Sequence, residues 1–168
     1  MQISENFTLK EFTSSETGMR LGIKEQFNPP ANIIENLKLL AVEVAEPIRT
    51  QFGAFSPTVA YRCKRVNDNI KGAAKKSQHL DGQSFDETFF KDGKEISDQV
   101  FFWLVNNRKN LKFTKLIWEK GDIVMPDWLH IGITPGQPQG ILVYDGKGYV
   151  DYFQSKHYIE HKKKGFVK

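Results

Sequence analysis

Three features that often reveal the class of a protein are missing from this sequence. It has one cysteine, Cys63, so no disulfide can form within the chain and nothing marks it for an oxidising compartment. It has no apolar run of about 20 residues, the length that a membrane-spanning helix needs. Its first residues lack the basic and apolar segments of a secretory signal, so we expect synthesis in the cytoplasm.

A strong excess of one charge is missing as well. The 24 basic and 20 acidic residues give a formal net charge of +4. Such a balance is compatible with anionic polymers, including cell walls and nucleic acid, but it selects neither. No basic run alternates with the stacking aromatic side chains that single-strand binders use. We therefore expect no nucleic-acid partner.

The remaining composition is that of an ordinary globular domain. At 168 residues, with 39% hydrophobic and 26% charged residues, the chain is long enough to bury a proper core. We expect one domain over residues 1–168, with an irregular N-terminal arm over 1–30 and a basic tail over 155–168. The tail is expected to be solvated or frayed, together with its His157 and His161.

A helix is the strongest element that the sequence predicts. Apolar residues recur at three- and four-residue spacing from Ile33 to Phe52, which is typical of a helix with one apolar face. Pro47 lies within this run and is expected to kink the helix or to begin a new turn. The other predicted elements are a strand over 57–61, a helix over 66–70, a strand over 83–90, a helix over 96–107, strands over 113–118 and 128–133, and a hairpin of 141–144 with 149–153.

Two short segments contain the residue types that bind zinc. His79 and Asp86 lie seven residues apart, with Gly82 between them to permit a tight turn, and His130 follows much later. Two histidines and one aspartate supply three protein ligands and leave a fourth position for water, which is the ligand count of catalytic zinc sites. A carboxylate such as Asp86 is also costly to bury on a strand without a cation. The sequence therefore predicts a zinc site.

The same segments carry a family resemblance. The pattern Ser-x-His-x-x-Gly-x-x-x-Asp at 77–86, followed by Trp-x-His at 128–130, resembles the paired motif of the zinc D-Ala-D-Ala metallopeptidases. This group includes lysostaphin-type peptidases and the hedgehog signalling domain, and the chain is most similar to its short phage and prophage members. The resemblance extends from about residue 7 to about residue 133.

The resemblance implies a fold, a cofactor and an activity. The fold would be α+β, a small antiparallel sheet with helices packed on one side and zinc in a cleft. The zinc ligands would be His79, Asp86 and His130. The activity would be endolysin-like hydrolysis of a peptide bond in peptidoglycan stem peptides, by carboxypeptidase or endopeptidase action. The protein would reach the cell wall after phage-mediated release or as a component of the virion.

The resemblance also implies a general base. In the similar enzymes, a carboxylate three residues before the last histidine ligand activates the attacking water, and Asp127 occupies that position here. Residues three apart on a regular strand face opposite sides of the sheet, so Asp127 must lie before the strand begins. Pro126, directly before it, favours such an irregular backbone. Glu119 is the alternative base.

Four further residues are expected around the reacting bond. Arg62 matches the family arginine that holds the scissile carbonyl oxygen and would stabilise the charge that develops there. Ser77 is expected to bond to substrate or to a ligand. Tyr61 and Trp128 would line the cleft, although core packing explains both equally well. The family usually has Ser-Gly before its Tyr-Arg pair, whereas this chain has Val-Ala at 59–60, so the subsite here has a different shape.

Two other functions stay open at the level of sequence. Cys63 lies between two basic residues at an expected helix start, where a thiolate is favoured, so a cysteine-peptidase dyad with His79 or His130 is conceivable. That mechanism leaves Asp86 and the paired motif unexplained. The other function is a non-catalytic, metal-stabilised domain that binds the wall or builds the virion, and the carboxylate retained at Asp127 argues against it.

Overall fold

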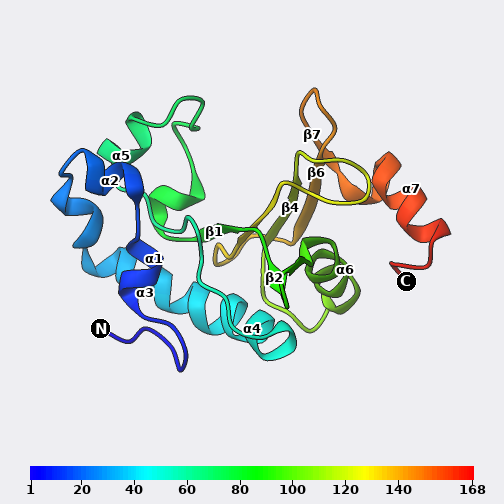
Figure 1. The fold of residues 1–168 in the computed structure, drawn as a ribbon, viewed down its shortest axis with the longest axis horizontal. Coiled ribbons are helices and arrows are strands. Elements are labelled where there is room, and N and C mark those ends of the chain that lie inside the picture. Colours follow the sequence, from blue (N-terminus) through cyan, green and yellow to red (C-terminus); the bar gives the residue numbers. More distant parts are fainter.

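Helices dominate the N-terminal half of the chain and a five-stranded sheet the C-terminal half, as a computed structural model of residues 1–168 shows (Figure 1). The N-terminal arm is more regular than expected. Thr8 and Glu11 cap its first helix by reciprocal hydrogen bonds, the pattern known as a capping box. The arm contains α1 (Leu9–Thr13), α2 (Glu16–Arg20) and the 3₁₀ turn η1 (Lys24–Phe27).

One long helical run follows the arm, as the apolar spacing predicts. It consists of α3 (Ala31–Leu40), the π-helical turn η2 (Ala41–Ala45) and α4 (Glu46–Phe52). Pro47 has no N–H to donate to the preceding turn, and the wider turn directly before it accommodates this loss without ending the run. The prediction that Pro47 begins a new turn is confirmed.

The sheet has the strand order β1-β5-β4-β6-β7. Its members are β1 (Ser84–Glu87), β5 (Trp128–Gly132), β4 (Lys115–Glu119), β6 (Gly140–Tyr144) and β7 (Tyr149–Asp151). Neighbouring strands are antiparallel except β4 and β6, because the segment 133–139 carries the chain from β5 past β4 to its far side. The α+β class and the β6–β7 hairpin are confirmed, and the sheet is mixed rather than wholly antiparallel.

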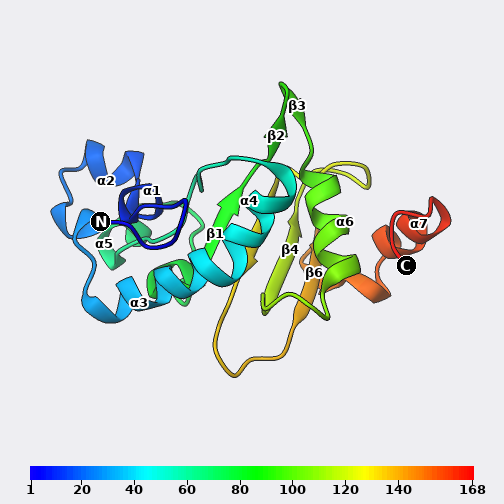
Figure 2. The same cartoon turned by 90° about the horizontal axis from the view of Figure 1, so that it is seen from below.

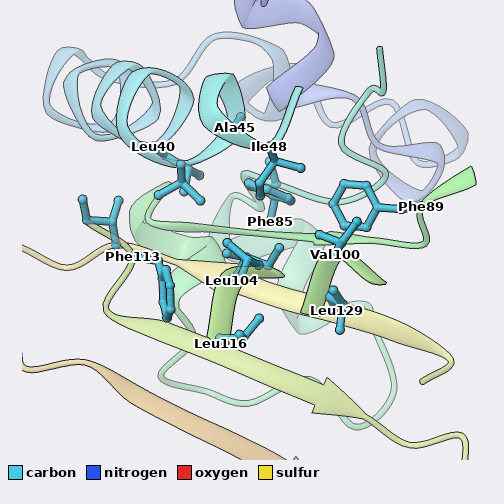
Figure 3. Packing of buried hydrophobic residues seen from close by; sticks show 14 of the residues in the cluster. Leu40, Ala45, Ile48, Phe85, Phe89, Val100, Leu104, Phe113, Leu116 and Leu129 are labelled. Atoms are coloured by element: carbon cyan, nitrogen blue, oxygen red, sulfur yellow. The ribbon is translucent and has the colours of Figure 1, made fainter. Parts of the chain in front are cut away.

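One face of the sheet is apolar and is covered by helices. It packs against the long helical run and against α6 (Ser97–Asn107), in a single cluster of buried hydrophobic residues that extends through both halves of the chain. Figure 3 shows Leu40 and Ile48 of the helical run on one side of this cluster and Leu116 and Leu129 of the sheet on the other. Each fully buried leucine stabilises the fold by about 1.5–3 kcal/mol.

The opposite face of the sheet is polar near its centre. Asp86 of β1 lies opposite His130 of β5, and His130 lies opposite Ile117 of β4. Because side chains alternate along a strand, Glu119 lies on the same face as Ile117 and therefore on the same face as Asp86 and His130. The alternation thus separates the apolar core from these ionisable side chains.

Two of the expected elements differ in the structure. The strand expected over 57–61 is reduced to one isolated bridge between Val59 and Asp86. The strand expected over 83–90 ends at Glu87, and a separate hairpin of β2 (Phe90–Lys91) and β3 (Lys94–Glu95) follows, which projects from the molecule in Figure 2. The helix expected over 66–70 is α5 (Lys64–Asp68).

The C-terminal tail is folded, so the prediction that it is frayed is wrong. A short turn, η4 (Tyr152–Gln154), leads into α7 (Lys156–Lys163). His161 of α7 is fully buried, its Nε2 lies 2.7 Å from the Ile123 carbonyl oxygen, and its Nδ1 lies 3.1 Å from the Tyr152 hydroxyl. These contacts dock α7 against the rest of the chain. No helix of the structure combines the length and the apolarity needed to cross a bilayer.

Candidate metal centre

Three elements bring the predicted ligands together. His79 lies on the 3₁₀ turn η3 (Gln78–Asp81), Asp86 on β1, and His130 on β5 directly opposite Asp86. One ligand atom from each residue lies within 4.8 Å of the other two. The chain separates Asp86 and His130 by 44 residues, so the pairing of β1 with β5 creates the cluster.

The position of His79 follows from its local sequence. The Ser77 hydroxyl accepts a hydrogen bond from the His79 amide and starts the turn, and Gly82 ends it at a φ of +63°. His79 Nδ1 lies 2.8 Å from the Ala60 carbonyl oxygen, which accepts only from a protonated nitrogen. Nδ1 therefore carries a proton, and Nε2, which lies 3.2 Å from Asp86 Oδ2, is the nitrogen available to a metal ion.

Asp86 bridges the two histidines. Its Oδ1 lies 2.8 Å from His130 Nδ1 and its Oδ2 lies 3.2 Å from His79 Nε2. Burial raises the pKa of the Asp86 carboxyl, but the hydrogen bonds and charge interactions with His130 and His79 outweigh burial and hold this pKa well below its usual range. Asp86 is therefore ionised at neutral pH, as a metal ligand must be.

The donor set fits a divalent metal ion such as zinc. Two imidazole nitrogens and one carboxylate oxygen are donors that zinc binds at about 2.0–2.2 Å, which places tetrahedral neighbours roughly 3.3 Å apart. The nitrogen-to-oxygen distances of 2.8 and 3.2 Å in the cluster are close to that spacing. Since one ligand atom of each residue lies within 4.8 Å of the other two, a single ion could contact all three residues.

A comparison with protein families agrees with this centre. The family model described as Peptidase M15 matches residues 5–103, which is more than half of the chain. The chain belongs to the Peptidase M15 family. Members of this family are metal-dependent peptidases, and the match includes His79 and Asp86 of the cluster. Neither the curated proteins nor the solved structures contain a match to the chain.

Arg62 lies beside the centre of this M15 peptidase. Its backbone N–H donates to the His79 carbonyl oxygen at 2.9 Å, and its Nη2 lies 3.4 Å from the Ser77 hydroxyl. Burial lowers the pKa of the guanidinium and the nearby Asp86 opposes this, so the group stays charged. Its Nε is buried without a hydrogen-bond partner.

The aromatic residues expected in the cleft have different surroundings. Tyr61 is 6% exposed and belongs to the hydrophobic core. Trp128 is half-buried on the same face of the sheet as His130, with Lys120 Nζ 5.1 Å above its ring. Trp128 thus lies next to the cluster, whereas Tyr61 supports the fold around it.

Two carboxylates lie near the cluster in contrasting environments. Asp127 precedes β5, as its predicted role required, and its side chain is exposed beside a groove that Lys120 and Lys147 also line. Glu119 is 6% exposed and accepts hydrogen bonds from the Tyr149 hydroxyl at 3.0 and 3.2 Å. Burial raises the pKa of Glu119, and the charges of His130 and Asp86 act on it. Glu119 is thus electrostatically coupled to the cluster.

Cys63 takes no part in the centre. It is 5% exposed and belongs to the hydrophobic core, and its backbone N–H donates to Gln26 Oε1 at 2.9 Å. The ring nitrogens of the two histidines contact Ala60, Asp86 and Gln78, and Cys63 is not among these partners. This geometry opposes a cysteine–histidine dyad.

Two residues near the centre were not predicted from the sequence. Gln78 contacts His130, and Tyr149 contacts Glu119. Gln78 stands inside the recognised motif but at one of its unspecified positions, and Tyr149 lies in a hairpin that the sequence places without any link to the site. Only the fold connects either residue to the cluster.

Proposed function

We propose that this M15 peptidase hydrolyses a peptide bond in peptidoglycan stem peptides with zinc as its metal. The observation that carries the proposal is the His79, Asp86 and His130 donor set in a chain of this family. Zinc, when bound, polarises a carbonyl group and makes a water molecule more acidic. His79 and His130 would hold the ion through their unprotonated nitrogens, and Asp86 through its carboxylate.

Glu119 is the residue that we propose as proton acceptor. It is a diagonal neighbour of His130 across the β4–β5 pair, and such positions lie roughly 7–8 Å apart, within reach of a long side chain. Its raised pKa, with burial as the cause, suits a group that takes a proton and then returns it to the leaving amine. The Tyr149 hydroxyl fixes the carboxylate in place. The exposed Asp127 is the alternative base.

Arg62 is proposed to stabilise negative charge on the scissile carbonyl oxygen. Its guanidinium is half-buried beside Ser77, and a fixed cation in such a site needs little rearrangement as charge develops. Trp128 and Ser77 would contact the substrate.

Peptidoglycan as substrate rests on the motif resemblance and on the net charge of +4, which is compatible with an anionic wall. The proposed place of action is the cell wall, reached after phage-mediated release or as part of a virion. Both routes to the wall are proposed from the similarity to short phage and prophage peptidases.

Release of new amino groups from purified peptidoglycan tests the proposed function. Zinc-loaded protein should release them, a chelator should stop the reaction, and added zinc should restore it. An Asp86→Asn variant serves as the control for contaminating hydrolases. Binding to the wall without release of amino groups, at any zinc concentration, would contradict the proposal and point to the non-catalytic wall-binding or virion-structural domain.

A further inference from the structure

The second ring nitrogen of His130 has a specific partner. Its Nδ1 faces Asp86 at 2.8 Å, and its Nε2 lies 3.1 Å from Gln78 Oε1. With a metal ion at Nδ1, the neutral ring carries its only proton on Nε2, and that proton needs an acceptor. The amide oxygen of Gln78 lies where this acceptor is needed.

The orientation of the Gln78 amide is fixed by two further residues. Thr134 has one hydroxyl proton, which it donates to Gln83 Oε1 at 2.8 Å. Its oxygen then accepts from Gln78 Nε2 at 2.9 Å. Because the amide nitrogen is held by Thr134, the amide oxygen is turned toward His130. The three side chains of Gln83, Thr134 and Gln78 form a relay that ends at the ring.

The backbone around the relay makes room for it. Gly132 lies two residues after His130 on the same face of β5, and a Cβ there would lie 3.1 Å from Gln78 Nε2 and 2.8 Å from the Gln83 carbonyl oxygen. The Gln83 N–H donates to the Gln78 carbonyl oxygen at 3.0 Å, which closes the turn beneath the two side chains. The relay therefore occupies a space that the missing side chain of Gly132 leaves free.

We infer that Gln78 is a positioning residue that selects the tautomer of His130 and orients its Nδ1 toward the metal, with Thr134 and Gln83 orienting Gln78. His79 has the same arrangement with a different partner, since its other nitrogen donates to the Ala60 carbonyl oxygen. One histidine is thus fixed by the backbone and the other by a side chain. Only the second can be altered by a single substitution.

Zinc affinity, measured by competition with a chromophoric chelator, tests this inference. Gln78→Leu should weaken zinc binding by about 10- to 100-fold, the usual loss when such a supporting partner is removed. Gln78→Glu should keep the affinity close to wild type, because its carboxylate also accepts from Nε2–H. Gln139→Leu is the matched control, since Gln139 is an exposed glutamine that bonds to the Arg108 and Leu111 carbonyl oxygens.

A spectroscopic measurement separates positioning from a purely structural role. In zinc-loaded protein with ¹⁵N-labelled histidine, long-range proton–nitrogen spectra should show His130 protonated at Nε2 and bound at Nδ1. Zinc affinity of Gln78→Leu within twofold of wild type, or a proton on Nδ1 of loaded His130, would overturn the inference. If Gln78→Leu does not fold, the Thr134 variants replace it. Thr134→Val should weaken zinc binding by less than Gln78→Leu would, and Thr134→Ser should restore the wild-type affinity. Equal zinc affinity in Thr134→Val and Thr134→Ser would overturn the inference.

The inference rests on the metal site of the proposed function and not on its substrate. Wild-type protein that binds zinc but releases no amino groups from peptidoglycan would contradict the proposed function. The zinc affinities of wild type and Gln78→Leu would still test the role of Gln78. Wild-type protein that binds no zinc would overturn both.

Discussion

At the scale of single residues, Glu119 and Asp127 compete for one chemical role. The sequence favours Asp127 because of its spacing from His130, whereas the structure gives Glu119 the buried position on the face of the cluster. Asp127 lies before β5, as a base at this position must, but its side chain is exposed. Spacing along the chain and position in space therefore favour different residues.

Substitution of each carboxylate by its amide separates the two assignments. Glu119→Gln should keep zinc and lower the turnover rate by about 10²–10⁴, the usual loss when a positioned base is removed. Asp127→Asn should keep both zinc and most of the turnover. Zinc content and amino-group release are measured side by side. The opposite result, full activity in Glu119→Gln and loss in Asp127→Asn, would restore Asp127 as the base.

The thiol of Cys63 provides a second prediction at this scale. Because Cys63 is buried in the core and contacts neither histidine, Cys63→Ser should retain most of the activity. A chelator should abolish that activity and added zinc should recover it. Activity that resists the chelator but is lost to an alkylating reagent would favour the cysteine-peptidase mechanism instead.

At the scale of secondary-structure elements, α7 shows how a basic tail becomes part of the fold. Three lysines in a row at 162–164 favour a solvated end, but His161, directly before them, is buried against Phe102 and Trp118. Ring centroids lie 4.7 Å and 5.2 Å from these two side chains. This buried histidine is one of the contacts that dock α7, together with Tyr158 and Val167.

The stability of the protein should therefore fall in acid through His161. Burial lowers the pKa of this imidazole, against the opposing hydrogen bond to the Ile123 carbonyl. The unfolded chain has the ordinary pKa of about 6.5 and binds more protons as the pH drops below it, so the free energy of unfolding decreases. Urea unfolding at pH 7 and pH 5 should show a larger loss in wild type than in His161→Gln.

His157 lies on the same helix, and burial lowers its pKa as well. His157→Gln is therefore measured in parallel, to separate the contributions of the two histidines to the loss of stability in acid. An identical pH dependence in wild type and in His161→Gln would show that this histidine does not titrate with unfolding.

Element by element, the sequence predicts what depends on local periodicity. The helical run from Ile33 to Phe52, helix α6 and the β6–β7 hairpin are confirmed within a few residues. The β2–β3 hairpin was missed because only two residues on each side pair, across a turn in which Asp92 and Gly93 have positive φ. The parallel β4–β6 pair was missed because it depends on the path of a loop, which periodicity does not record.

The residues of the candidate site also differ in whether the sequence predicts them. His79, Asp86 and His130 are found from their motif, and the structure brings them together. Gln78 and Tyr149 carry no motif, and their link to the site depends on side-chain rotamers and strand register. Contacts between segments far apart in the chain are what the sequence does not reveal.

At the scale of the whole molecule, the three ligands connect the two halves of the chain. Figure 1 shows β1 between the helical N-terminal part and the remaining strands. His79 precedes β1, Asp86 lies on it, and His130 lies on its only ladder partner, β5. A bound ion would therefore hold the turn η3 to the sheet.

Metal binding should consequently stabilise the fold. A ligand at 100 times its dissociation constant adds about 2.7 kcal/mol to the free energy of unfolding. For a chain of this size that corresponds to a Tm increase of roughly 5–10 °C. Thermal unfolding with zinc and with chelator should show this difference in wild type and none in His79→Ala or His130→Ala. Equal Tm shifts in these variants would place the metal elsewhere.

The position of β1 at the edge of the sheet bears on how such a domain can be inherited. The segment that matches the family, residues 5–103, ends inside α6, before β4 and β5. Recombination that transferred this segment alone would carry His79 and Asp86 to a new gene without His130 and without the strand that holds β1 in place. A transfer that preserves the metal centre must therefore include β5.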